Sequence, residues 1–166
     1  MRKFLIAALF CSPLPAYGGW GVTPEQQEML DALGPLDWND PAAVAAEVIG
    51  NCYGDDCYDL FTYLCQENVE DPGTTIALSE CRAIEAAAWQ QEIDTTTALL
   101  RGHYAEDGGG THPAFEAVIT AWEAYRKARC DFEMGKVNGT MTGLAYVTCL
   151  AETNARHAHF LSLYDN

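Results

Sequence analysis

The stretch WEAYRKARCDFEMGK, residues 122–136, decides how this chain folds, because one predicted helix there carries a cysteine beside an aromatic and basic face. Residues three and four apart lie on the same side of an α-helix, so Trp122, Tyr125 and Arg126 share a face and Cys130 follows one turn later. Basic side chains near the C-terminal end of a helix also oppose its dipole, which is worth about 0.3–1 kcal/mol each. We therefore expect this basic cluster to be mostly architectural.

A second stretch, CLAETNAR at residues 149–156, repeats the helical spacing. Cys149, Thr153 and Arg156 fall at positions i, i+4 and i+7, and a glycine-containing turn separates them from the first stretch. A bond between Cys130 and Cys149 would clamp two antiparallel helices near their shared turn. Closing a loop of about 20 residues in this way is worth roughly 3 kcal/mol in the chain-entropy account of disulfides.

Helix signals dominate the rest of the chain. Thr23 and Asp40 are candidate N-caps, each followed by a proline, and Gln26 completes a capping box with Thr23. The pattern predicts further helices over residues 56–65, 74–101, 113–133 and 140–163, with Gly102 ending the longest. One face of that helix carries Leu78, Cys81, Glu85, Trp89 and Ile93. The sequence predicts a single all-α domain with an antiparallel helical core.

The chain opens MRKFLIAALFCSPLPAYGGW, which has the pattern of a secretory signal peptide. Its apolar run is too short to span a bilayer, and prolines and small residues follow. We place cleavage after Gly18, with Ala16 as the alternative. A lipoprotein would be lipidated at Cys11, but the large Phe10 before it argues against this. The sequence thus predicts a periplasmic or secreted protein without a membrane span: a signal peptide (1–18), an acidic N-terminal arm with short helices (19–49) and a helical domain (50–166).

The cysteine count agrees with export. Six cysteines follow the signal peptide, and an even set in a short exported chain predicts three disulfides, although six cysteines allow 15 pairings. A zinc site is the alternative, but no two cysteines have the CxxC spacing that structural zinc sites favour. The six are Cys52, Cys57, Cys65, Cys81, Cys130 and Cys149.

Charge is the most distinctive feature of the composition. The chain has 24 acidic and nine basic residues, a formal net charge of −15, and loss of Arg2 and Lys3 with the signal peptide would leave −17. Between Gly19 and Cys81 there are 13 Asp and Glu and no Lys or Arg. Such a field repels nucleic acid and anionic membranes and favours cationic partners, although a highly charged surface also serves solubility alone.

Motifs for catalysis or for a cofactor are not found. There is no GxSxG elbow, and cysteines in disulfides cannot act as nucleophiles. The three glycines at 108–110 lack the strand and lysine of a phosphate-binding loop. His157 and His159 are two positions apart on a helix and face different directions, so we expect no metal site there. The sequence predicts a protein that is not an enzyme and holds no cofactor.

The spacing W-x2-Y-R-x3-C, a glycine turn, then C-x3-T-x2-R resembles the LprI-type lysozyme-inhibitor domain, a family of exported bacterial proteins. Glu85 and Trp89 on the long helix, with Cys65 before it, also fit the family pattern. The family often has an acid directly after that aromatic, where this chain has Gln90. The resemblance covers roughly residues 50–163. The residues that carry it have the character of structural framework, and they are Glu85, Trp89, Trp122, Tyr125, Arg126, Thr153 and Arg156.

Two structural expectations follow. We pair Cys130 with Cys149, Cys65 with Cys81 and, by elimination, Cys52 with Cys57. We also expect Arg126 or Arg156 to be partly buried against a carboxylate, and the candidate carboxylates are Asp94, Glu85 and Glu133.

The resemblance implies that the protein binds and inhibits lysozyme, and a basic lysozyme would suit the acidic composition. The alternative is a non-enzymatic structural or interaction protein of the bacterial envelope with another partner. The loop HYAEDGGGTH is the first candidate for the binding surface, because it is expected to be exposed and mobile. Its candidate contact residues are Tyr104, Glu106 and Asp107.

Overall fold

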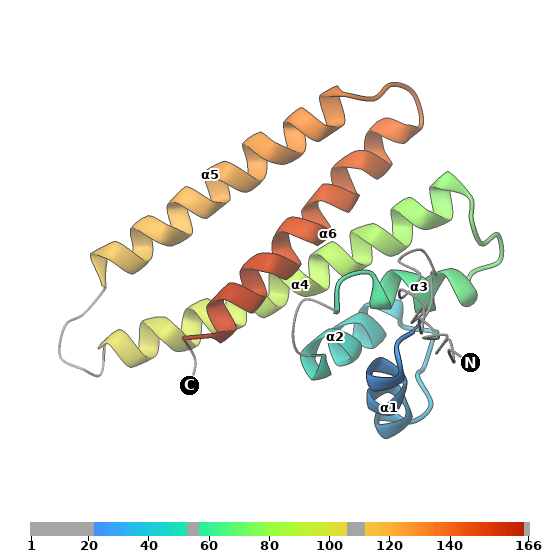
Figure 1. Cartoon of the computed structure of the whole chain (residues 1–166), viewed down its shortest axis with the longest axis horizontal. Coiled ribbons are helices and arrows are strands. Elements are labelled where there is room, and N and C mark those ends of the chain that lie inside the picture. Colours follow the sequence, from blue (N-terminus) through green and yellow to red (C-terminus); the bar gives the residue numbers. More distant parts are fainter. Residues whose placement is uncertain (1–21, 53–56, 106–111, 165–166) are drawn as a thin grey trace, which may run out of the picture.

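The computed structural model describes residues 22–52, 57–105 and 112–164. Those ranges contain helices and turns and no strand, which confirms the all-α prediction for the part of the chain that is described (Figure 1). The helices are α1 (Pro24–Leu33), α2 (Pro41–Asn51), α3 (Leu60–Glu67), α4 (Thr75–Tyr104), α5 (Pro113–Gly135) and α6 (Met141–Ser162).

The N-terminal ends of the first two helices are fixed by the residues that the sequence indicated. The Thr23 backbone N–H donates to Gln26 Oε1 at 2.7 Å and the Gln26 N–H donates to Thr23 Oγ1 at 3.2 Å, which is a complete capping box. Asp40 Oδ1 accepts from the Ala43 N–H at 3.1 Å at the start of α2. Local sequence chemistry therefore accounts for where α1 and α2 begin.

Three long helices form the body of the molecule. α6 packs along both α4 and α5, so it is the common partner of the other two (Figure 1). α5 runs antiparallel to α6, as expected, whereas α4 and α6 run in the same direction (Figure 1). The turn between α5 and α6 holds Gly139, whose φ of 69° is in the left-handed region that glycine adopts without strain.

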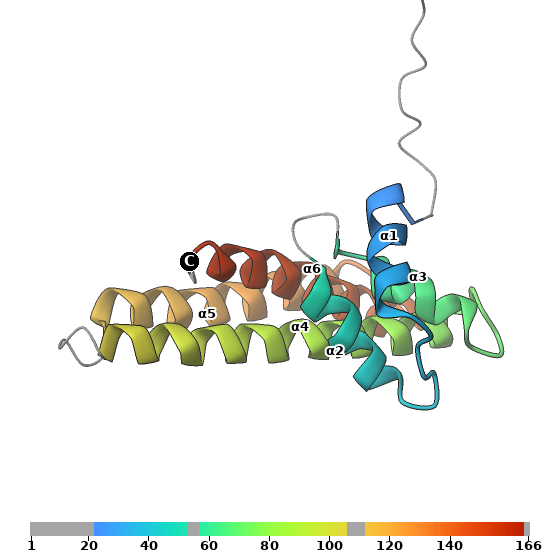
Figure 2. The same ribbon diagram turned by 90° about the horizontal axis from the view of Figure 1, so that it is seen from below.

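The short helices gather around the N-terminal half of α4 (Figure 2). α2 buries Val44, Ala45, Val48 and Ile49 in the common core, and α3 adds the fully buried Phe61. α1 buries no residue completely and packs through partly buried apolar side chains. The described part of the predicted acidic arm therefore contributes to the core through α2. That residues 19–49 form a separate unit stays a prediction.

The three predicted disulfide pairings are confirmed. Cys52 pairs with Cys57, Cys65 with Cys81, and Cys130 with Cys149, at Cα–Cα distances of 5.6, 5.8 and 5.4 Å. The second bond ties α3 to α4, and the third ties α5 to α6. Each long-range tie therefore joins neighbouring elements in the bundle.

The predicted end of the longest helix is wrong by a few residues. α4 continues through Gly102 to Tyr104. The added turn is supported by tertiary contacts, since the Tyr104 ring lies 4.9 Å from the His112 ring and 5.4 Å from the Phe115 ring. The low helix propensity of one glycine, about 1 kcal/mol, is smaller than the gain from such packing.

Candidate functional site

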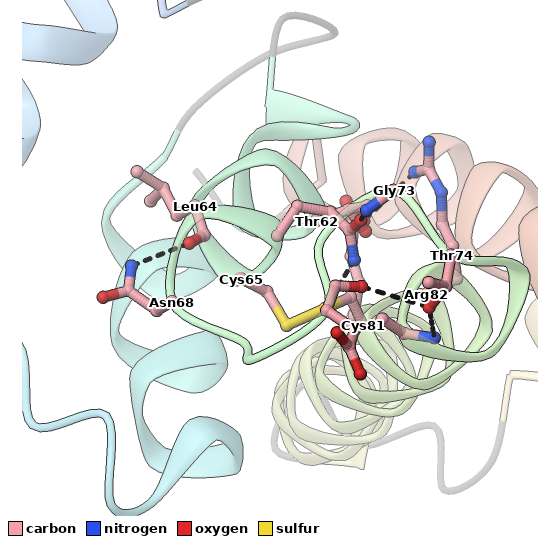
Figure 3. The surroundings of a disulfide bond; sticks show 12 residues. Thr62, Leu64, Cys65, Asn68, Gly73, Thr74, Cys81 and Arg82 are labelled. Carbon is pink, nitrogen blue, oxygen red and sulfur yellow. Dashed lines mark hydrogen bonds and ion pairs between the residues drawn. A yellow bond between two sulfur atoms is a disulfide. The ribbon is translucent and has the colours of Figure 1, made fainter.

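A buried charged cluster lies where α3 meets α4, beside the Cys65–Cys81 bond (Figure 3). Glu85 of α4 is fully buried. Its Oε1 accepts from the Asp59 backbone N–H at 3.0 Å, and its Oε2 accepts from Arg82 Nη1 at 3.2 Å and from the Thr62 hydroxyl. Arg82 also forms an ion pair with the Asp59 carboxylate. Arg82 thus joins a fully buried carboxylate, Glu85, to Asp59, whose side chain is 46% exposed.

The electrostatics of this cluster follow from burial. Burial raises the pKa of Glu85, and the hydrogen bond from Thr62 and the charge of Arg82 oppose that rise only in part. Burial also works against the charge of Arg82, but hydrogen bonding to Asp59 and the nearby negative groups keep the pKa of Arg82 above its usual value. The Tyr58 ring covers the guanidinium at 5.1 Å. The Arg82–Glu85 pair is buried and holds α3 on α4, while the Asp59 side chain stays partly exposed.

A second cluster joins all three long helices. Arg126 of α5 donates from Nη1 to Oε1 of Gln90 on α4 and, at 3.1 Å, to Oδ1 of Asn154 on α6. Its guanidinium also lies 4.5 Å from the centre of the Trp122 ring. Asn154 is 2% exposed and donates in turn to the Ala86 carbonyl at 2.9 Å. The oxygens that hold Arg126 are therefore neutral amide oxygens.

His157 of α6 belongs to the same neighbourhood. Its ring stacks on the Trp122 ring at a centroid distance of 4.0 Å, with only 6° between the planes. Burial, followed by the positive charge of Arg126, lowers the pKa of His157 to about 4. Its buried Nε2 finds no hydrogen-bond partner among the described residues. His157 is therefore a neutral ring at neutral pH and acts as packing.

The expectation of an Arg126 or Arg156 buried against a carboxylate is wrong. Arg126 is half-buried, but Asp94 reaches it only through Gln90, whose Nε2 donates to Asp94 Oδ1 at 2.8 Å. The Arg156 side chain is 70% exposed and pairs with Glu152 at 2.9 Å. Of the other two candidates, Glu133 pairs with Lys136 at 2.5 Å and Glu85 belongs to the cluster of Arg82.

Sequence reasoning missed Arg82. The sequence does contain a pattern that indicates its role, because Glu85 lies in a stripe of apolar residues on α4 and a buried carboxylate needs a cation nearby. Arg82 lies three residues before Glu85 and is the nearest basic residue on that helix. Asp59 could not have been found in this way, since it reaches the cluster from a left-handed backbone conformation with a φ of 74°.

The remaining motif residues divide into core and surface. Trp89 and Thr153 are buried, and the Thr153 hydroxyl lies 3.9 Å from the sulfur of Cys130 and 3.8 Å from that of Cys149. Tyr125, by contrast, is 56% exposed. The motif therefore mainly marks the junction of α4, α5 and α6 and the disulfide at its end.

Only part of the candidate binding loop can be placed. Tyr104 is half-buried, and its ring packs against the rings of His112 and Phe115. An ion pair of 2.7 Å between Arg101 and Glu116 closes the base of the loop. Glu106 and Asp107 lie outside the described residues. Tyr104 thus supports the helix ends, and its part in binding stays a prediction.

The described ranges contain neither a group of metal-ligating side chains nor a membrane-spanning helix. Nowhere in 22–52, 57–105 and 112–164 do three His, Cys, Asp or Glu side chains come close enough together to hold a metal ion. No helix in these ranges combines the length and apolar character that crossing a membrane requires.

Charge is unevenly distributed among the helices. Arg82 is the first Lys or Arg after residue 3, so α1, α2 and α3 carry none. Those helices and their connections carry acidic residues throughout, and they lie together around one half of α4 (Figure 2). The other six basic residues lie on the C-terminal end of α4, on α5 and the turn after it, and on α6. The group formed by α1, α2 and α3 therefore carries acidic side chains and no Lys or Arg, although Arg82 near the start of α4 pairs with the adjoining Asp59.

Comparison with protein families gave one match. Residues 65–161 fit the family described as "Lysozyme inhibitor LprI". The matched span begins at Cys65 and contains α4, α5 and almost all of α6. No curated protein and no solved structure matched significantly.

Proposed function

Because the chain belongs to the lysozyme inhibitor LprI family, we propose that it is an exported protein that binds and inhibits a basic lysozyme and catalyses no reaction itself. The observation that carries the proposal beyond the family name is the group of helices α1, α2 and α3, which carries acidic residues and no Lys or Arg. Complementary charge steers two proteins together and raises the association rate constant, from about 10⁵–10⁶ M⁻¹s⁻¹ for neutral pairs toward 10⁸–10⁹ at low salt. A strongly basic enzyme is the kind of partner that α1–α3 would attract.

The direct test is inhibition of cell-wall lysis. The mature protein should slow lysis by a basic lysozyme at a near-stoichiometric ratio. Inhibition should weaken as salt rises beyond about 0.15 M, where the screening length is about 8 Å. If no lysozyme type is inhibited at any salt concentration, the proposal is wrong. A structural or interaction protein of the envelope with another partner would then be the better account.

The contact surface can be located by separating association from dissociation. We expect the loop before α5 to enter the enzyme's cleft and the acidic helices α1, α2 and α3 to provide steering. Glu106→Gln with Asp107→Asn should raise the dissociation rate, whereas Glu25→Gln with Glu28→Gln on α1 should mainly lower the association rate at low salt. The two double variants remove the same charge, so each is the control for the other.

Equal effects of the two double variants would mean that only diffuse charge attraction operates, and the loop would then be excluded as the contact surface. A larger increase in the inhibition constant for the loop variant would support the loop. Surface plasmon resonance at two salt concentrations measures both rates directly.

Export can be checked separately on the native protein. We propose cleavage near Gly18, so N-terminal sequencing of protein from the periplasm or the medium should begin at Gly19, or at Tyr17 if Ala16 is the cleavage site. A lipid-modified N-terminus at Cys11 would contradict this and would instead place the protein on a membrane surface.

A further inference from the structure

Arg126 differs from every other basic residue that the structure describes. The six others each form an ion pair with a carboxylate; these are Arg82, Arg101, Lys127, Arg129, Lys136 and Arg156. Arg126 forms none within the described ranges, in a chain where acidic residues outnumber basic ones by 24 to nine. Its half-buried charge is held by the neutral oxygens of Gln90 and Asn154.

The guanidinium also keeps free donors. Both of its hydrogen bonds come from Nη1, and among the described residues Nε and Nη2 donate to no acceptor. The guanidinium carbon lies 4.5 Å from the centre of the Trp122 ring, so Trp122 covers the flat face of the group and not the edge formed by Nε and Nη2. Nε and Nη2 are the two donors that bind both oxygens of one carboxylate in the strong side-on arrangement.

Arg126 belongs to the wall of a groove. α4, α5 and α6 line it together, and its volume is about 720 Å³. Pockets for small molecules typically measure about 300–1,000 Å³ and combine apolar walls with a few polar groups. The apolar part comes from alanines of α4 and from α6, and the full apolar lining is Ala83, Ala86, Ala87, Tyr146, Val147 and Leu150.

We propose that this groove binds a small amphipathic monocarboxylate, whose two oxygens take Nε and Nη2 of Arg126 while its apolar part lies along the α4 and α6 walls. A single negative charge is favoured over a phosphate or polyanion, because the net charge of the protein repels multivalent anions. Glu123 and Lys127 both line the same groove, and Lys127 is paired with Asp131, so Glu123 adds to that discrimination. Binding here is separate from lysozyme inhibition and does not depend on it.

Octanoate is a suitable probe, with octanamide as its uncharged counterpart of nearly equal size. The mature protein should bind octanoate with a dissociation constant below about 1 mM and bind octanamide at least about tenfold more weakly. Calorimetry measures both affinities, and methyl NMR should show shifts of Ala83 and Ala87 in the groove but none of Ala45 in the α2 core. The proposal would be overturned if octanoate did not bind at 10 mM, a concentration about tenfold above the expected dissociation constant. Equal affinity for the two probes would also overturn it.

Gln90→Glu is the sharpest variant, because it supplies Arg126 with a carboxylate from within the protein and should keep the fold. We expect it to weaken octanoate binding by at least about tenfold and to leave octanamide binding unchanged. Glu123→Gln should strengthen octanoate binding, and Arg126→Gln should abolish the preference for the acid. Arg156→Gln is the matched control, since Arg156 is exposed and already paired, and it should change neither affinity. If Gln90→Glu binds octanoate as well as the unaltered protein, Arg126 does not hold the carboxylate and the assignment fails.

Discussion

Arg82 and Arg126 lie in two comparable regions, but they differ in burial and in the groups that surround their charge. Each is close to a half-cystine on its own helix, Cys81 directly before Arg82 and Cys130 one turn after Arg126, and each joins its helix to a neighbour. Arg82 is 5% exposed and faces two carboxylates. Arg126 is half-buried and faces two amides.

The difference shows that the degree of burial determines which groups must surround an arginine side chain. A charge that is almost dry needs an opposite charge, because burial of an unpaired ion costs several kcal/mol. A charge at the edge of a groove keeps part of its hydration and can rely on amide oxygens. The first arrangement can only stabilise the fold, while the second leaves donors available to a ligand.

The largest effect is expected at Arg82. Arg82→Met leaves the fully buried Glu85 without its cation, which should lower the free energy of unfolding by about 3–5 kcal/mol. Denaturant titration of the mature protein measures the loss. Adding Glu85→Gln to this variant should recover part of it, because the neutral amide removes the buried negative charge. A loss below about 1 kcal/mol would mean that the cluster is hydrated and that the contrast with Arg126 is false.

Removing either of the disulfides beside the two arginines should lower the free energy of unfolding by a similar amount. Replacing Cys65 and Cys81 by serine, or Cys130 and Cys149, opens loops of 16 and 19 residues, and chain entropy predicts a loss of about 3 kcal/mol in each case. Thermal unfolding of the two double variants tests this. A clearly larger loss at Cys65–Cys81 would show that this bond also holds the charged cluster together.

His157 should make the region of Arg126 sensitive to acid. The pKa of this ring is lowered from 6.5 to about 4, so between these values the unfolded chain binds a proton that the folded protein does not. Stability should therefore fall as the pH drops from about 6.5 to 4, by about 1–3 kcal/mol. His157→Phe keeps the stack on Trp122 and should remove this part of the pH dependence. His159→Gln is the control, and an unchanged pH profile in His157→Phe would contradict the assignment.

The smallest effects are expected from the arginines that the sequence singled out. Arg126→Gln removes two hydrogen bonds to amides at a hydrated groove and should cost about 1–2 kcal/mol. Arg156→Ala removes only an exposed ion pair with Glu152 and should cost about 0–1 kcal/mol. Melting temperatures of the two variants rank them. If Arg156→Ala were the more destabilising, exposure would be a poor guide to the role of these arginines.

Much of this architecture could be predicted from the sequence, because local rules determine it. The capping residues Thr23 and Asp40 follow from the turn chemistry at a helix start, and helix periodicity places Cys130 and Cys149 on facing helices. The pairing of Cys52 with Cys57 follows by elimination once the other two pairs are chosen. The long helix was predicted well except at Gly102, where packing of Tyr104 outweighs propensity.

The candidate sites were harder to predict, because they depend on contacts between residues far apart in the chain. Sequence spacing placed Arg126 on the correct face of α5 but could not show that Gln90 and Asn154 would meet it. It also gave no hint that the carboxylates near Arg82 would include Asp59, whose position depends on an unusual backbone conformation. The periodicity of a helix says which side is inward, and the identity of the opposite side chain depends on the register between helices.

The position of α6 has a consequence for the order in which the molecule assembles. The hydrogen bond from Asn154 to Ala86 joins residues 68 positions apart, so α4 acquires its main partner only after the rest of the chain has been made. Synthesis proceeds from the N-terminus, and the part of α4 around Ala86 that meets α6 therefore lacks this partner while α5 is added. The last helix to be made completes the core. A chain truncated before α6 would leave both α4 and α5 without their common partner, exposed to aggregation and proteolysis.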